Sequence, residues 1–249
     1  SDLDVQIEGG GPVGALSRLV MPDETAFEGR IDLDLRAPVP FDPDRLEGSV
    51  AVSDGRFEQG TLGLILEQIE ARAEISQGEI RLPAFSARDR EEGRLSGQGT
   101  YRFAGGNTLS VTADALQIAD RSAYSAKASG ELRLEQTNAG YVVAGDFGID
   151  RAGIDLEALP GAGLTTLDVR FPGQDETAQP VEEDEPPRVR LDIEIRAPGR
   201  IFVSGQGLDA EMSLEAAIEG PLGEPRLFGL AEIVRGRFDL AGKRFRFAD

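Results

Sequence analysis

Apolar and charged residues alternate strictly along several stretches of the chain, and residues 188–196 are the clearest case. The apolar members of this stretch are Val189, Leu191, Ile193 and Ile195. A charged residue separates each of them from the next, and the same period of two recurs in residues 30–36 and 131–135. This period places one set of side chains on each face of a strand, whereas helical spacing would mix them. These stretches predict β-strands with one apolar and one charged face.

Glycines open many of these stretches, at irregular intervals along the chain. A propeller or a leucine-rich repeat would show a fixed period. The pattern therefore predicts a long meander of antiparallel strands with loops of varying length.

Two stretches leave the type of element open. Residues 64–75 fit either an amphipathic helix or a strand, and the strand is favoured because strands are predicted on both sides. Residues 114–128 are rich in alanine and are expected to form a loop or a short helix.

One hairpin near the end of the chain can be placed by parity. Phe238 and Leu240 are even-numbered, whereas Phe245 and Phe247 are odd-numbered, so both pairs share a face only across a loop of even length. A four-residue loop over residues 241–244 would place Leu240 opposite Phe245 and Phe238 opposite Phe247.

Residues 172–187 differ from the rest, because they are acidic, rich in proline and almost free of aliphatic side chains. Such a composition predicts a flexible loop or linker. It divides the chain into residues 1–171 and 188–249, whose strands could still join one sheet.

The amino-acid composition excludes most types of catalytic site. The 249 residues include no His and no Cys, so neither a Cys/His zinc site nor a Ser-His-Asp triad can form. The 45 acidic residues are expected to cover solvated strand faces, and the calcium-binding EF-hand pattern is absent. The sequence therefore predicts no enzyme, no metal site and no cofactor. A net charge of −19 also opposes nucleic-acid binding.

A single antiparallel sheet with one apolar face must bury that face in a sandwich, close into a barrel, or curl into a trough that another molecule fills. Periodicity alone does not decide between the sandwich, the barrel and the trough. Parity predicts that the following residues share the apolar face: Ile31, Leu33, Leu35, Val50, Val52, Ile80, Leu82, Leu132, Leu134, Phe147, Ile149, Leu191, Ile193, Ile195, Ile201, Val203, Leu214, Ile218, Phe238, Leu240, Phe245 and Phe247.

Residues 191–247 favour the trough, because they closely resemble the C-terminal region of the TamB family, the inner-membrane component of the translocation and assembly module in the AsmA-like superfamily. The similarity lies in residues 199–203, 205–211, 234–240 and 242–245. Residues 1–171 look like more divergent repeats. The resemblance implies an all-β fold, an elongated and curled antiparallel sheet that forms a U-shaped hydrophobic groove, known as a β-taco.

The resemblance also implies a place and two functions. The place is the periplasm, in a protein anchored in the inner membrane and reaching the outer membrane. The anchor and the contacts with an outer-membrane β-barrel partner of the TamA type are expected outside these residues, since no apolar run approaches 18 residues. The functions are conduction of phospholipids, whose acyl chains would fill the groove, and assistance in outer-membrane protein assembly or secretion. The alternatives are a polypeptide-binding module for β-barrel clients and a closed sandwich with a structural role.

Overall fold

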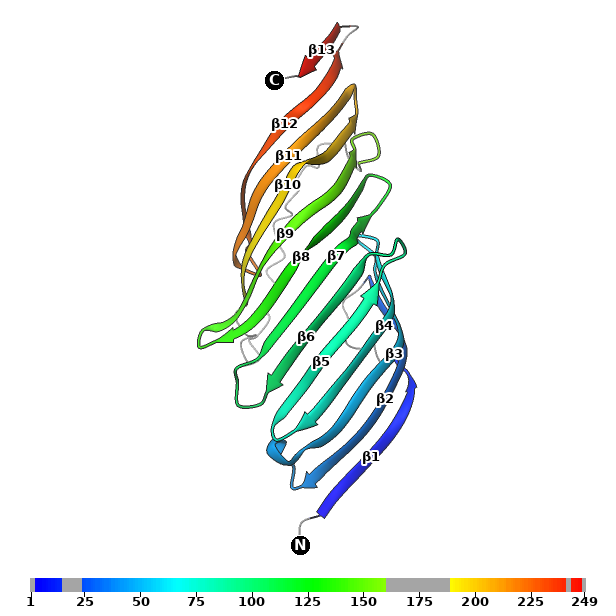
Figure 1. Ribbon diagram of the computed structural model, residues 1–249, viewed down its shortest axis with the longest axis vertical. Coiled ribbons are helices and arrows are strands. Elements are labelled where there is room, and N and C mark those ends of the chain that lie inside the picture. The colour runs from blue at the N-terminus through cyan, green and yellow to red at the C-terminus, as the bar shows by residue number, and fades with distance from the viewer. Residues whose placement is uncertain (1–2, 15–23, 160–188, 241–242, 248–249) are drawn as a thin grey trace, which may run out of the picture.

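The computed structural model describes residues 3–14, 24–159, 189–240 and 243–247, and they form one 13-stranded sheet (Figure 1). The strands lie side by side in chain order. Their bounds are β1 Leu3–Pro12, β2 Thr25–Val39, β3 Glu47–Gln59, β4 Leu64–Ser76, β5 Glu79–Arg88, β6 Arg94–Arg102, β7 Thr108–Asp120, β8 Tyr124–Thr137, β9 Gly140–Asp155, β10 Val189–Gly205, β11 Leu208–Pro221, β12 Arg226–Leu240 and β13 Lys243–Phe247. A 3-10 turn, η1 Pro43–Arg45, precedes β3. Within these ranges no helix is long and apolar enough to cross a membrane.

Alternation predicts the strands well where it is strict. In β2 the odd-numbered side chains are half-buried and the even-numbered ones are exposed as far as Ala37. Residues 64–75 form β4, which confirms the favoured interpretation. The open, curled all-β sheet implied by the family resemblance is also confirmed.

The prediction for residues 114–128 is wrong, because β7 and β8 occupy most of them. The pairing of these strands shifts between Ala113 and Leu116 and again between Gln117 and Ala119. Ala115 adopts a φ of 48° at the first shift, and its amide donates to the Ser129 hydroxyl at 2.8 Å. Because a β-bulge inserts an extra residue, it breaks the two-residue period that identifies a strand.

The predicted register of the last hairpin is also wrong, although the shared face is correct. Phe238 lies opposite Phe245 and Leu240 lies opposite Lys243, so β12 and β13 flank two residues rather than four. The shorter connection adds another residue pair to the ladder. It also brings Arg244 within 3.0 Å of Asp239. Residues 241–242 themselves lie outside the described part of the chain.

One neighbouring pair departs from the antiparallel meander. β10 runs parallel to β9, with Val189 opposite Tyr141 and Val203 opposite Ile154, whereas every other neighbouring pair is antiparallel. Parallel neighbours need a long crossover connection, and residues 156–188 (188 − 155 = 33 residues) make it. The predicted linker at residues 172–187 belongs to this connection and lies outside the described residues.

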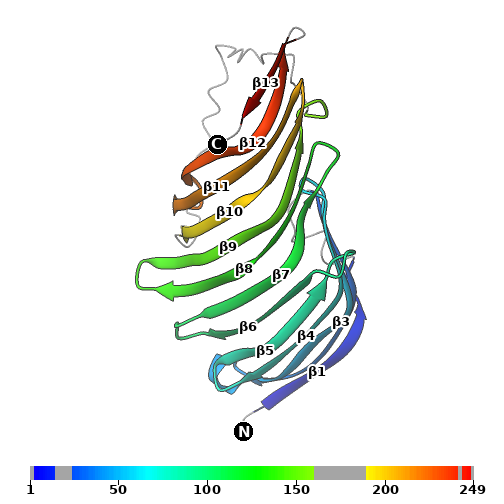
Figure 2. The same cartoon turned by 45° about the horizontal axis from the view of Figure 1, so that its top comes forward.

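The sheet bends along its length and curls across its width (Figure 2). β4 and β7 contact each other directly, although β5 and β6 lie between them in the sheet. The cluster that packs at this bend consists of apolar-face side chains. The sheet therefore bends toward its apolar face.

Candidate functional site

The candidate site is the apolar face, which runs through all the strands as cross-strand rows. One row follows the ladder from β1 to β6 and consists of Ile7, Leu35, Gly48, Ile75, Ile80 and Tyr101. A second continues from β5 to β11 and consists of Leu82, Gly99, Leu109, Leu134, Val143, Leu191 and Gly220. Because directly opposite side chains lie about 5 Å apart, these rows make the apolar surface continuous across the parallel step.

The register places every predicted site residue on this same face. Ile31, Leu33 and Leu35 lie opposite Val52, Val50 and Gly48, respectively. Leu132, Leu134, Phe147 and Ile149 share the face across β8 and β9, and the predicted residues of β10–β13 continue it. Whether these side chains hold a ligand stays a prediction.

An apolar hollow of about 320 Å³ lies on this face, and its aromatic lining was not predicted. Ile80, Leu82 and Leu134 belong to the predicted set, whereas Tyr101 and Tyr141 do not. The Asn107 side-chain amide donates to the Tyr141 hydroxyl at 3.2 Å. Tyr101, Gly99 and Gly97 are all odd-numbered and lie on the apolar face of β6. Their shared parity could have placed Tyr101 on this face, but because two of the three are glycines, the sequence of β6 shows no alternation of apolar and polar side chains.

One end of β3–β9 packs on itself and forms the main buried cluster of the described residues. Leu66, Ala87, Ala113 and Leu116 are buried there, and Phe147 of β9 packs against them. Leu116 is 4% exposed and Leu66 is 7% exposed. This part of the apolar face is therefore a core rather than an open surface.

Turns from both sides of the cluster are joined by hydrogen bonds. The Asp120 amide donates to the Leu62 carbonyl at 2.8 Å, and the Tyr124 hydroxyl donates to the Thr61 carbonyl at 3.1 Å. The β3–β4 turn thus reaches the β7–β8 turn above the shorter β5–β6 hairpin. These contacts close the rim of the groove over β5 and β6.

Asp89 holds the recessed β5–β6 turn in place. Its carboxylate accepts from the amides of Glu91 and Gly93, both at 2.7 Å, and from the Gln117 amide at 2.6 Å. Asp89 is one of only two buried polar residues in the described ranges. Because its oxygens serve three backbone donors, its role here is structural.

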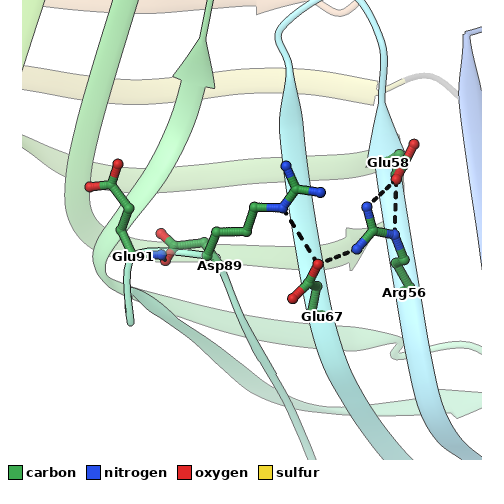
Figure 3. A network of polar contacts seen from close by, with 6 residues as sticks. Arg56, Glu58, Glu67, Asp89 and Glu91 are labelled. Carbon is green, nitrogen blue, oxygen red and sulfur yellow. Dashed lines mark hydrogen bonds and ion pairs between the residues drawn. The ribbon is translucent and has the colours of Figure 1, made fainter.

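Ion pairs surround this turn on the polar face (Figure 3). The Arg56 guanidinium donates to both Glu58 and Glu67, and Arg90 lies 3.5 Å from Glu67. The Lys127 ammonium lies 2.6 Å from Glu91. The hydrogen bond to Glu91 raises the pKa of Lys127, and the hydrogen bond to Glu58 raises the pKa of Arg56. Both cations are thus held charged as links between strands.

No group of three or more potential metal-binding side chains gathers in the part of the chain that the structure describes. The Asp89 carboxylate binds backbone amides, and the contacts around Arg56 pair opposite charges. The extended feature left for binding is the apolar face.

In a comparison with protein families, residues 83–248 match the TamB C-terminal domain. No curated protein and no solved structure matches the chain. The matched region begins inside β5 and includes every strand from β6 to β13. It reaches much further back than the predicted similarity at residues 191–247.

The family match and the fold agree. The matched region covers two thirds of the chain (166 of 249 residues), and its strands belong to the curled sheet that the resemblance implies. The chain belongs to the TamB family, whose members are cell-envelope proteins involved in outer-membrane biogenesis.

Proposed function

We propose that the apolar face is a conduit for the acyl chains of phospholipids, and that the protein supports outer-membrane biogenesis without catalysing a reaction. The observation that carries this proposal is that, among the residues that the structure describes, no second layer covers the apolar face. Within the described ranges no large side chain is fully buried. A sandwich would bury such side chains, since the inner faces of its two sheets interdigitate.

The energetics of transfer suit a carrier. Each methylene that leaves water gains about 0.8 kcal/mol, so an acyl chain of about 16 carbons gains on the order of 10 kcal/mol. Moving the same chain from a bilayer into an equally apolar groove is nearly neutral. A conduit needs that balance, because it must release what it takes up.

The hollow beside Tyr101 and Tyr141 supports the same occupant. The surface of its lining is almost entirely apolar, and two of its lining residues, Asn107 and Tyr141, are joined by a hydrogen bond from the Asn107 amide to the Tyr141 hydroxyl. An aromatic ring with one polar atom suits a boundary between acyl chain and headgroup. Its volume of about 320 Å³ is close to the lower limit of about 300 Å³ for ligand pockets.

The proposed place is the periplasm, in a protein anchored in the inner membrane through a segment outside these residues. An outer-membrane β-barrel of the TamA type is the proposed partner at the far end. The division into residues 1–171, a linker at 172–187 and residues 188–249 remains part of this proposal.

Native mass spectrometry of the purified chain, with organic extraction of bound material, tests the conduit. We expect co-purified phospholipid in the unmodified chain and its loss in Ile193→Asp. Ile193 lies on the apolar face of β10, between Gly145 of β9 and Ile218 of β11. A charge there interrupts the apolar face between β9 and β11.

Gln98→Asp is the matched control, since it adds the same charge to the exposed polar face of β6. It should keep the bound lipid. A stable chain that carries no lipid would contradict the proposal, as would equal lipid loss in both variants. Bound peptide in place of lipid would favour a module for polypeptide clients.

A further inference from the structure

The charge of the protein reverses in its last two strands. The whole chain has 26 basic and 45 acidic residues, a net charge of −19. β12 and β13 contain six basic residues (Arg226, Arg235, Arg237, Lys243, Arg244 and Arg246) and two acidic ones (Glu232 and Asp239), a net charge of 6 − 2 = +4. The rest of the chain therefore has −19 − 4 = −23.

Four of these arginines gather on the polar face. Arg235, Arg237, Arg244 and Arg246 line a shallow hollow of about 490 Å³ together with Phe202 of β10. Arg237 and Arg246 lie directly opposite each other on neighbouring strands. Like charges in this position are destabilising, so folding alone does not explain the pair.

Three of these arginines have carboxylate partners. Arg235 lies 2.6 Å from Glu211, Arg237 2.9 Å from Asp209 and Arg244 3.0 Å from Asp239. The pairs of Arg237 and Arg244 are exposed on both sides, and such surface pairs contribute about 0–1 kcal/mol. Glu211 is only 17% exposed, so its pair with Arg235 is the firmest of the three. Arg246 has no ion pair within the described ranges. The guanidinium groups are thus available to a stronger acceptor such as phosphate, which arginine binds in bidentate geometry.

Exposed apolar side chains also lie on this polar face, at the other end of β12. Phe228 and Leu230 lie opposite Ala217 and Glu215, so they point away from the groove. Phe228 is 50% exposed and Leu230 is 60% exposed, and Arg226 lies 5.8 Å from the Phe228 ring. A surface that combines basic residues with exposed aromatic and aliphatic groups is typical of proteins that rest on anionic lipid headgroups.

We propose that the polar face of β12 and β13 docks on a membrane surface, where Arg235, Arg237, Arg244 and Arg246 bind the phosphates of anionic phospholipids. Four carboxylates of the neighbouring strand β11, Asp209, Glu211, Glu215 and Glu219, share this polar face and reduce its positive charge, whereas the negative charge of β1–β9 is screened. β1–β9 lie at least four strand spacings from β13, about 19 Å along the sheet, and the Debye length at physiological ionic strength is about 8 Å. The docking is separate from acyl-chain binding in the groove and does not require it.

Flotation of the full 249-residue chain with lipid vesicles tests the docking surface. We expect binding to vesicles of phosphatidylcholine with about one third phosphatidylglycerol, and much weaker binding to phosphatidylcholine alone. One basic residue near an anionic surface is worth roughly a factor of five. Arg237→Gln/Arg246→Gln should therefore weaken binding about 25-fold, whereas Arg237→Lys/Arg246→Lys should keep most of it.

Arg30→Gln/Arg133→Gln is the control, because both arginines belong to exposed ion pairs of β2 and β8 and their loss gives the same net charge. It should leave vesicle binding unchanged. Equal loss in the control, equal loss in the lysine variant, or equal binding to neutral vesicles would overturn the proposal. Binding to soluble polyglutamate without binding to vesicles would assign the arginines to an acidic protein partner and would also overturn it.

Ile193→Asp separates this proposal from the conduit. It should abolish co-purified lipid and leave vesicle binding intact. If no lipid is found in the groove but anionic vesicles still bind through the arginines, the conduit fails and the docking surface stands.

Discussion

Two parts of the sheet have the same alternating pattern, but their apolar faces differ in burial. In β3–β9 the apolar face closes on itself, and Leu66 and Leu116 are 7% and 4% exposed. In β12–β13 apolar side chains such as Leu227 and Leu240 remain 71% and 55% exposed. The difference arises because β4 reaches β7 across a short hairpin, whereas β12 and β13 have their main contacts with their neighbours in the ladder. Alternation thus predicts which side chains share a face, but the bend of the sheet decides whether that face is core or open surface.

The largest expected effect comes from placing a charge in the closed part. Leu116→Asp puts an unpaired carboxylate into the cluster of Leu66, Ala87 and Ala113. We expect a loss of about 4 kcal/mol or more in the free energy of unfolding, measured by urea denaturation. Leu240→Asp should change it by no more than about 0.5 kcal/mol. Similar losses in both variants would show that the two parts do not differ.

Crowding can be tested with two glycines of the apolar face. A Cβ at Gly97 would lie 2.4 Å from the Phe85 ring and 2.4 Å from the Ser110 carbonyl oxygen, whereas a Cβ at Gly9 meets nothing within 4 Å. Gly97→Val should therefore cost about 1–3 kcal/mol through overpacking. Gly9→Val should leave the stability unchanged or raise it slightly. Thermal melts of both variants measure the two effects. A neutral result for Gly97→Val would mean that the sheet can flatten there at little cost.

A smaller effect is expected at the closed rim. Tyr124→Phe removes the hydroxyl that donates to the Thr61 carbonyl at 3.1 Å. Loss of this hydrogen bond should lower stability by about 0.5–1.5 kcal/mol and speed amide hydrogen exchange in residues 60–63. Unchanged exchange there would show that the Asp120–Leu62 hydrogen bond and the Arg121–Thr61 hydrogen bond close the rim without the Tyr124 hydroxyl.

The smallest expected effect concerns the Lys127–Glu91 ion pair. Lys127→Gln should lower the melting temperature by no more than a few degrees, as is usual for surface pairs. The hydrogen bond to Glu91 raises the pKa of Lys127 above its ordinary value. Its contribution is therefore complete below that ordinary value, about 10.4, and is lost as the pH rises through the higher value of the folded state. A difference between variant and parent that already changes between pH 6 and 9 would contradict this assignment.

Strict alternation in β2 and β10 was sufficient to predict strands and the face of each side chain. It failed in β7, where bulges near Ala115 and Gln117 interrupt the period. The parallel pairing of β9 with β10 was also hidden, since the side-chain period of a strand does not specify its partner or direction. Residues 235–246 are basic in the sequence, but which of their arginines lie opposite each other on the polar face depends on the register of β12 and β13, which parity predicted wrongly.

Most strands contact mainly their neighbours in the sheet, and the contact between β4 and β7 is the main exception. This pattern has a consequence for how such a groove varies in length. Each hairpin adds two strands to the wall and alters only the strand beside it, as in a solenoid of stacked repeats. Length then becomes modular, and insertion or deletion of whole hairpins changes the reach of the groove while its cross-section stays the same. In such an array unfolding is local, and the β4–β7 contact marks the section expected to melt last.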